Sequence, residues 1–133
     1  MNNISQKAQE RIQEAQEKQL TTLDLSDCQL DQIPDEVFTL TNLTRLNLSS
    51  NHINTISDDI LKLVNLTRFN LFDNHINNIP NVIFQLINLT RLNLSNNQIT
   101  IIPDAIYSLK KLTVLYFNSN QITTIPDAIF ALR

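Results

Sequence analysis

The sequence contains no glycine, and this absence excludes several classes of catalytic and nucleotide-binding site. A phosphate-binding G-x-x-x-x-G-K loop, a dinucleotide-binding G-x-G-x-x-G turn and a G-x-S-x-G nucleophile elbow all depend on the steric freedom of glycine. No Ser–His–Asp set can be assembled from the outward-facing repeat positions described below. We therefore expect a protein that is not an enzyme and that needs no cofactor.

Cysteine and long apolar segments are also scarce. Cys28 is the only cysteine, so no intramolecular disulfide can form, which fits a reducing compartment. No apolar run approaches the ~18 residues of a membrane helix, and residues 1–20 lack the apolar stretch of a secretory signal. The net charge of −3 disfavours nucleic acid and anionic membranes as partners. We predict a cytoplasmic protein that binds neither.

A 23-residue repeat fills most of the chain. Each unit follows the pattern L-x-x-L-x-L-x-x-N-x-I-x-x-I-P-x-x-I-x-x-L-x-x. The five units start at Leu20, Leu43, Leu66, Leu89 and Leu112. Cys28 replaces the asparagine of the first unit, and Ser57 replaces the proline of the second. So many aligned columns indicate a repeat architecture.

Over about residues 20–133 this pattern resembles the leucine-rich-repeat family, and I-P-x-x-I is similar to its intracellular, Ras-associated and bacterial types. The resemblance implies an α/β solenoid curved into an arc. It also implies a parallel β-sheet on the concave face and short helical or extended segments on the convex face. We expect residues 1–19 to form an N-terminal cap and residues 20–133 to form five repeats that continue beyond Arg133.

Elementary energetics require the units to stack. In L-x-L the two leucines share one side of a strand and the residue between them faces the other side. About seven apolar positions per unit contribute roughly 10–20 kcal/mol when buried. Ordering a unit costs roughly 35 kcal/mol, so one unit cannot fold alone and the array must fold together.

Asparagine recurs at one position of the pattern. These residues, which we call the inner asparagine column, are Asn51, Asn74, Asn97 and Asn120. An amide can satisfy backbone groups left free where the chain leaves the strand, so we predict a buried structural ladder. Cys28 is expected to be a small buried thiol at the same height.

The two ends of a solenoid expose apolar surface unless they are covered. Residues 4–18 carry Ile4, Ala8, Ile12 and Ala15 at helical spacing, which predicts an amphipathic helix over the first repeat, capped by Asn2, Asn3 or Ser5. No such cap follows the fifth unit. We therefore expect an open flank that continues into further chain or associates end to end with another copy. The residues expected there are Leu115, Phe117, Ile122, Ile125 and Ile129.

Residues between the strand leucines should face the concave side, where we predict a protein-binding site. Its candidates are the arginine column (Arg45, Arg68 and Arg91), the outer asparagine column (Asn47, Asn70 and Asn93), the aromatic residues Phe72 and Tyr116, and the neighbouring His52 and His75.

The arginine column has two interpretations. Its side chains are either solvated and partly paired with Asp24 or Asp73, or they form a rigid comb for carboxylates of a partner. Three arginines are too few for a nucleic-acid footprint. Two imidazoles and the nearby Asp73 carboxylate can bind zinc, but a catalytic site usually needs three fixed ligands and a second shell, so we predict no metal.

Three functions fit these observations. The first is a protein-interaction module that uses the concave face. The second is the regulatory segment of a larger enzyme, because a Gln/Glu-rich helix leading into L-x-x-L-D-L-S at residues 20–26 resembles bacterial Roco-type GTPases. The third is a structural spacer without a partner.

Overall fold

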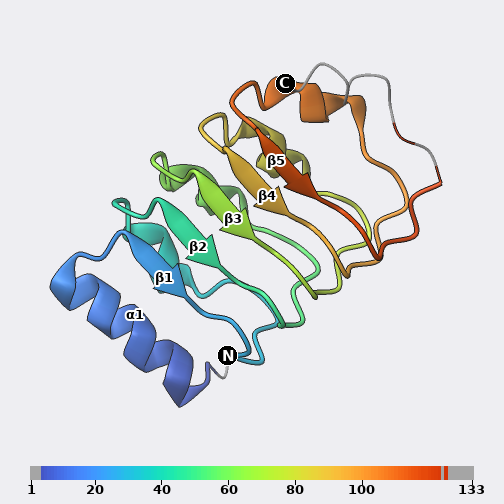
Figure 1. Ribbon diagram of the computed structural model, residues 1–133. Coiled ribbons are helices and arrows are strands. Elements are labelled where there is room, and N and C mark those ends of the chain that lie inside the picture. Colours follow the sequence, from blue (N-terminus) through green and yellow to red (C-terminus); the bar gives the residue numbers. More distant parts are fainter. Residues whose placement is uncertain (1–3, 124, 126–133) are drawn as a thin grey trace.

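Five short parallel strands form one sheet whose order follows the sequence (Figure 1). The computed structural model describes residues 4–123 and 125. The strands are β1 (Thr22–Asp24), β2 (Arg45–Asn47), β3 (Arg68–Asn70), β4 (Arg91–Asn93) and β5 (Val114–Tyr116). Paired residues lie 23 positions apart, as Leu23 and Leu46 do. The columns of the sequence are therefore stacked in space, and the predicted parallel repeat solenoid is confirmed.

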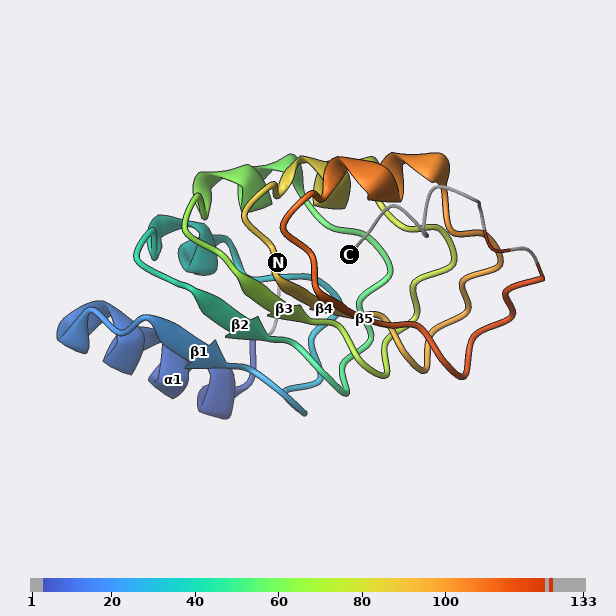
Figure 2. The ribbon, with the colours of Figure 1, turned by 45° about the horizontal axis from the view of Figure 1, so that its top comes forward.

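A layer of short 3₁₀-helices lies opposite the sheet and completes the arc (Figure 2). These helices are η1 (Asp35–Thr39), η2 (Asp58–Lys62), η3 (Asn81–Gln85) and η4 (Asp104–Ser108). A proline precedes three of them and fixes φ near the value that a helix start requires. Ser57 replaces this proline before η2, and its hydroxyl accepts the Asp59 N–H at 3.1 Å. The serine thus supplies a cap where the other units use a rigid ring.

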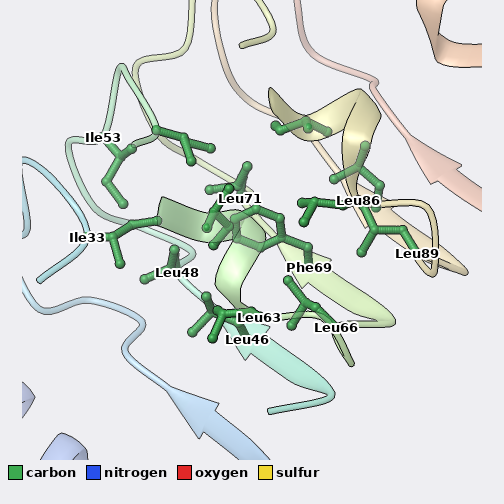
Figure 3. Close-up of a cluster of buried hydrophobic side chains, with 14 of the residues drawn as sticks. Ile33, Leu46, Leu48, Ile53, Leu63, Leu66, Phe69, Leu71, Leu86 and Leu89 are labelled. Atoms are coloured by element: carbon green, nitrogen blue, oxygen red, sulfur yellow. The ribbon is translucent and has the colours of Figure 1, made fainter. Parts of the chain in front are cut away.

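Aliphatic side chains of consecutive repeats fill the space between the two layers (Figure 3). Phe69 occupies the strand position that leucine holds in the other repeats, and only 2% of it is exposed. It lies among residues of its own and neighbouring repeats, including Leu46, Leu66, Leu71 and Leu89. The apolar columns therefore form one continuous core.

The inner asparagine column joins successive repeats. In Asn74, Oδ1 accepts the N–H of Ile53 at 3.0 Å. Its Nδ2 donates to the carbonyl of Leu48 at 2.9 Å, and more weakly to Leu71 and Phe72 at 3.2 and 3.3 Å. Among the described residues, no buried side-chain nitrogen or oxygen lacks a partner. The predicted structural ladder is confirmed.

A left-handed residue follows each strand, although the chain has no glycine. The residues at this position are Asp27, Ser50, Asp73, Asn96 and Ser119, with φ between 53° and 57°. Asn and Asp tolerate this conformation better than most residues, whereas serine has less compensation for it. The sequence analysis did not predict this feature.

Helix α1 (Gln6–Lys18) lies along the free edge of β1 (Figure 1). It begins two residues later than predicted, because Ser5 is its cap and accepts the Ala8 N–H at 3.2 Å. Its buried side chains are Ala8, Ile12 and Ala15, so the helix covers the first repeat.

The predicted apolar flank of the fifth repeat lies partly outside the described residues. Leu115, Phe117 and Ile122 are partly buried against the core, and Ile125 is exposed. Ile129 is not among the described residues, so the open flank stays a prediction.

Candidate protein-binding surface

A shallow groove of about 350 Å³ runs across all five strands on the face of the sheet that points away from the core, which is the face predicted to be concave. Its polar lining comprises Thr22 and Asp24 on β1, the arginine and outer asparagine columns on β2 to β4, and Tyr116 on β5. The structure therefore brings together seven of the ten residues that the sequence analysis predicted for the binding site. Phe72, His52 and His75 do not line this groove.

The arginine column stands in register on three adjacent strands. Arg45 and Arg91 are exposed and Arg68 is partly exposed. The positive charge of Arg45, then burial, and then the charge of Arg91 lower the pKa of Arg68. Ion pairs among the described residues are Arg11–Asp24, Lys18–Glu14 and Lys62–Asp59, so none of them neutralises the column.

The outer asparagine column lies beside the arginines, and each of its side chains makes one hydrogen bond within the described residues. Each Oδ1 accepts the backbone N–H two residues later, at 2.9 Å for Asn47 and Asn70 and 3.0 Å for Asn93. No hydrogen bond between described residues uses the Nδ2 groups of these three asparagines, and all three asparagines are partly exposed. The column therefore presents donors to the groove while its acceptors hold the turn.

Asp24 occupies the asparagine position on β1, but it faces a different environment. Arg11 of α1 donates to the Asp24 carbonyl at 2.9 Å and lies 3.7 Å from its carboxylate. Burial would raise the pKa of Asp24, but hydrogen bonds from Ser26 and the charges of Arg11 and Lys7 outweigh it and lower that pKa. Among the described residues Asp24 therefore pairs with Arg11 and not with the arginine column, because α1 supplies the nearer cation.

The two candidate aromatic anchors have different surroundings. Tyr116 lines the groove at its β5 end and is 51% exposed. Phe72 comes directly after β3 and is partly buried. Tyr116 is thus the accessible aromatic side chain of the groove.

The histidines form a pair outside the groove lining. The ring centroids of His52 and His75 lie 5.2 Å apart, and both side chains are exposed. Within the part of the chain that the structure describes, no group of three His, Cys, Asp or Glu residues is placed to hold a metal ion.

One apolar surface was missed in the sequence. Val64 and Ile87 occupy equivalent positions of two adjacent repeats, are each 61% exposed, and line a second groove of about 290 Å³. The sequence could have indicated this surface, because the equivalent position carries a polar residue in the first and fourth repeats, Thr41 and Lys110, and is therefore solvent-facing.

A parallel sheet whose strands pair at a constant interval of 23 residues defines the class of repeat solenoids. Residues 18–76 match the family model described as leucine rich repeat. Residues 87–129 match the model described as leucine-rich repeats in two copies. Together the two matches cover more than half of the chain, and the protein belongs to the leucine-rich-repeat family.

Solved structures of the same family are similar to this chain. An internalin (inlF) from Listeria monocytogenes is 27% identical, with a TM-score of 0.77 over 91% of this chain and 35% of its own. A leucine-rich-repeat protein of Leptospira interrogans is 29% identical, with a TM-score of 0.68 over 90% of this chain and 37% of its own. A second internalin (inlC2) is 27% identical, with a TM-score of 0.72 over 86% of this chain and 48% of its own. No curated protein matches the sequence.

This chain therefore spans about a third of the length of the first two structures. Leucine-rich-repeat domains are in general protein-interaction modules that bind protein partners. No helix within residues 4–123 has both the length and the apolar character needed to cross a bilayer.

Proposed function

We propose that this chain is a protein-interaction module that binds its partner in the concave groove. The observation that carries the proposal is the arginine column, which lies in an open groove with no ion-pairing carboxylate among the described residues. Exposed arginine beside an accessible tyrosine is typical of protein-binding hot spots. We assign no catalytic or metal-binding role to the chain.

The proposed contact residues fall into two groups. The arginine and outer asparagine columns and Tyr116 form the groove itself. Phe72, His52 and His75 lie beside or beyond its lining, and we propose them as peripheral contacts.

Affinity capture with matched variants tests this function. The groove variant replaces the three residues of the arginine column with alanine. The lysine control variant replaces Lys62, Lys110 and Lys111 with alanine and so changes the net charge by the same amount. These lysines are exposed and lie outside this groove. We expect a protein that the wild type and the lysine control retain and that the groove variant loses. Equal recovery by all three would refute the groove as the binding site, and the absence of any specific protein would favour a structural spacer.

A second proposal is that the array regulates a larger enzyme of the Roco-type GTPase class. It is supported by the pattern at residues 20–26 directly after α1. A G-x-x-x-x-G-K-[S/T] motif downstream in the complete reading frame would support it, and an array followed by no such motif would contradict it.

The remaining proposals concern organisation and location. We propose a cap in residues 1–19, five repeats in residues 20–133 that continue into further chain, and a cytoplasmic location, supported by the single buried cysteine. Fractionation of the source cell tests the location. End-to-end self-association through the fifth repeat predicts a sedimentation coefficient that rises with concentration, whereas a constant monomer value would contradict it.

A further inference from the structure

The groove offers far more hydrogen-bond donors than acceptors over its three central strands. Each guanidinium carries five N–H donors and no acceptor. The Oδ1 atoms of the outer asparagine column are engaged by backbone N–H groups, which leaves their amide N–H groups to face the groove. A partner that fills this surface must therefore supply acceptors, and anionic ones are favoured by the charge of the column.

The positive charge is local rather than general. The whole chain has a net charge of −3, yet the arginine column has no ion-pair partner among the described residues. Asp24, the carboxylate within the groove, is held by Arg11 at the β1 end. The groove is thus acidic at β1, basic over β2 to β4, and aromatic at β5.

The strand spacing limits how anionic groups can be arranged. Adjacent strands lie about 4.8 Å apart, so the arginine column extends over roughly 9.6 Å from Arg45 to Arg91. In an extended peptide, side chains on one face repeat every ~6.7 Å. Two alternating carboxylates therefore fit within the column, whereas a third would extend beyond it. A single phosphate would occupy one gap between two guanidinium groups and leave the third arginine unpaired.

We propose that the groove binds an extended acidic segment of a partner protein that carries two carboxylates in the alternation Asp/Glu-x-Asp/Glu. This rests on the proposed function and specifies its partner. The segment crosses the strands, places its carboxylates on the arginine column, and sets an apolar residue against Tyr116. Because Tyr116 lines the groove on β5, the apolar residue lies on the β4 side of the acidic pair.

Selection from a random twelve-residue peptide display library tests the proposal. The baits are the wild type, a triple Arg→Gln variant of the arginine column, a Tyr116→Ala variant and a triple Lys→Gln version of the lysine control. Thermal unfolding followed by circular dichroism shows that each bait is folded. We expect the wild type and the lysine control to enrich alternating acidic pairs with an apolar residue on one side of the pair. The arginine variant should lose this enrichment, and Tyr116→Ala should lose the apolar preference alone.

Fluorescence anisotropy of one selected peptide gives the quantitative test. We expect Arg68→Gln to weaken binding about tenfold, because Arg68 borders both gaps of the column. Replacing both acidic residues by glutamine should abolish binding, and raising NaCl from 50 to 500 mM should weaken it about tenfold. A phosphoserine peptide that binds more than tenfold better than its glutamate counterpart would overturn the carboxylate assignment in favour of phosphate.

The outcomes separate this inference from the proposed function. Peptides that lack acidic pairs but lose binding with Tyr116→Ala would overturn the acidic segment and leave the concave groove as a binding site. Peptides unaffected by every groove substitution, or no enrichment at all, would refute both.

Discussion

Replacing Asn74 by alanine tests whether the inner asparagine column stabilises the fold through its acceptor or its donors. The three carbonyls that Asn74 contacts each keep a second partner: Asn51 for Leu48, Asn97 for Leu71, and the Ser50 N–H for Phe72. The Ile53 N–H has no other partner in the part of the chain that the structure describes, so the substitution would leave it buried and unpaired. One such group costs ~1–3 kcal/mol, and weakening the carbonyl contacts adds about 1 kcal/mol. We therefore expect a loss of about 2–4 kcal/mol.

The same reasoning predicts a larger loss of stability for the alanine variant of Asn51. The Asn51 Oδ1 accepts two N–H groups, from Cys28 at 3.1 Å and from Leu30 at 2.9 Å. Asn51→Ala leaves both unpaired, so its loss should exceed that of Asn74→Ala by ~1–3 kcal/mol. Asn77 is exposed in the same repeat as Asn74, and Asn77→Ala should change stability by less than about 0.5 kcal/mol.

Urea unfolding followed by far-ultraviolet circular dichroism measures these differences. The slope of the free energy of unfolding with denaturant must stay constant among the variants for the comparison to hold. Equal losses at Asn51 and Asn74, or a loss at Asn74 as small as at Asn77, would refute the assignment of the cost to unpaired N–H groups.

An Asn74→Asp variant separates donor from acceptor by pH. A carboxylate there still accepts the Ile53 N–H but faces the Leu48 carbonyl, so burial and repulsion raise its pKa in the folded state. The penalty is absent below the unfolded pKa of ~3.9 and grows by about 1.4 kcal/mol per pH unit above it, until the folded pKa is reached. The variant should therefore approach wild-type stability near pH 4 and fall below Asn74→Ala near pH 7. A pH-independent difference would contradict this reasoning.

Three further predictions concern the cap, the edge of the groove and the turns. Ser5→Ala removes the cap of α1 and should cost about 1 kcal/mol, measured as faster amide exchange in that helix. Asp24→Asn should lower the free energy of unfolding by less than ~0.5 kcal/mol, because the Asp24 side chain is 54% exposed. Since the pKa of Asp24 is lowered in the folded protein, this difference should disappear in urea unfolding as the pH falls below 3.8, the ordinary pKa of the group. Ser50→Gly relieves a left-handed residue with φ of 56° and should raise stability by about 0.5–1 kcal/mol in urea unfolding, whereas Asn96→Gly should raise it less, since asparagine tolerates this conformation.

The fold could be predicted because each packing position recurs in five repeats with a similar side chain. A column such as that of Leu23 and Leu46 fixes the direction of the side chain, the register and the parallel pairing together. The left-handed turns could not be predicted in the same way. The five residues at that position are all small and polar, but such residues also fill neighbouring columns, and the absence of glycine removed the usual signal.

The sequence predicted which repeat columns line the candidate site, but it predicted less well where single residues such as Phe72 lie. Alternation in the strands placed the arginine column and Tyr116 on one face, and they line one groove. Phe72 follows the strand, where the chain turns, so alternation no longer fixes its direction. The ion pair of Asp24 depends on where α1 packs, and the repeat carries no information about that helix.

Hydrogen bonding in the turns also determines what the groove can recognise. The outer asparagines hold the chain as it leaves each strand by accepting the N–H two residues later. Because this structural task uses the acceptors, the amide donors are what face a ligand. An aspartate in the same column would hold the turn equally well, as Asp24 does for the Ser26 N–H, but would place a negative charge beside the arginines. Asparagine at β2 to β4 therefore preserves the turn while leaving the positive charge of the arginine column for a partner.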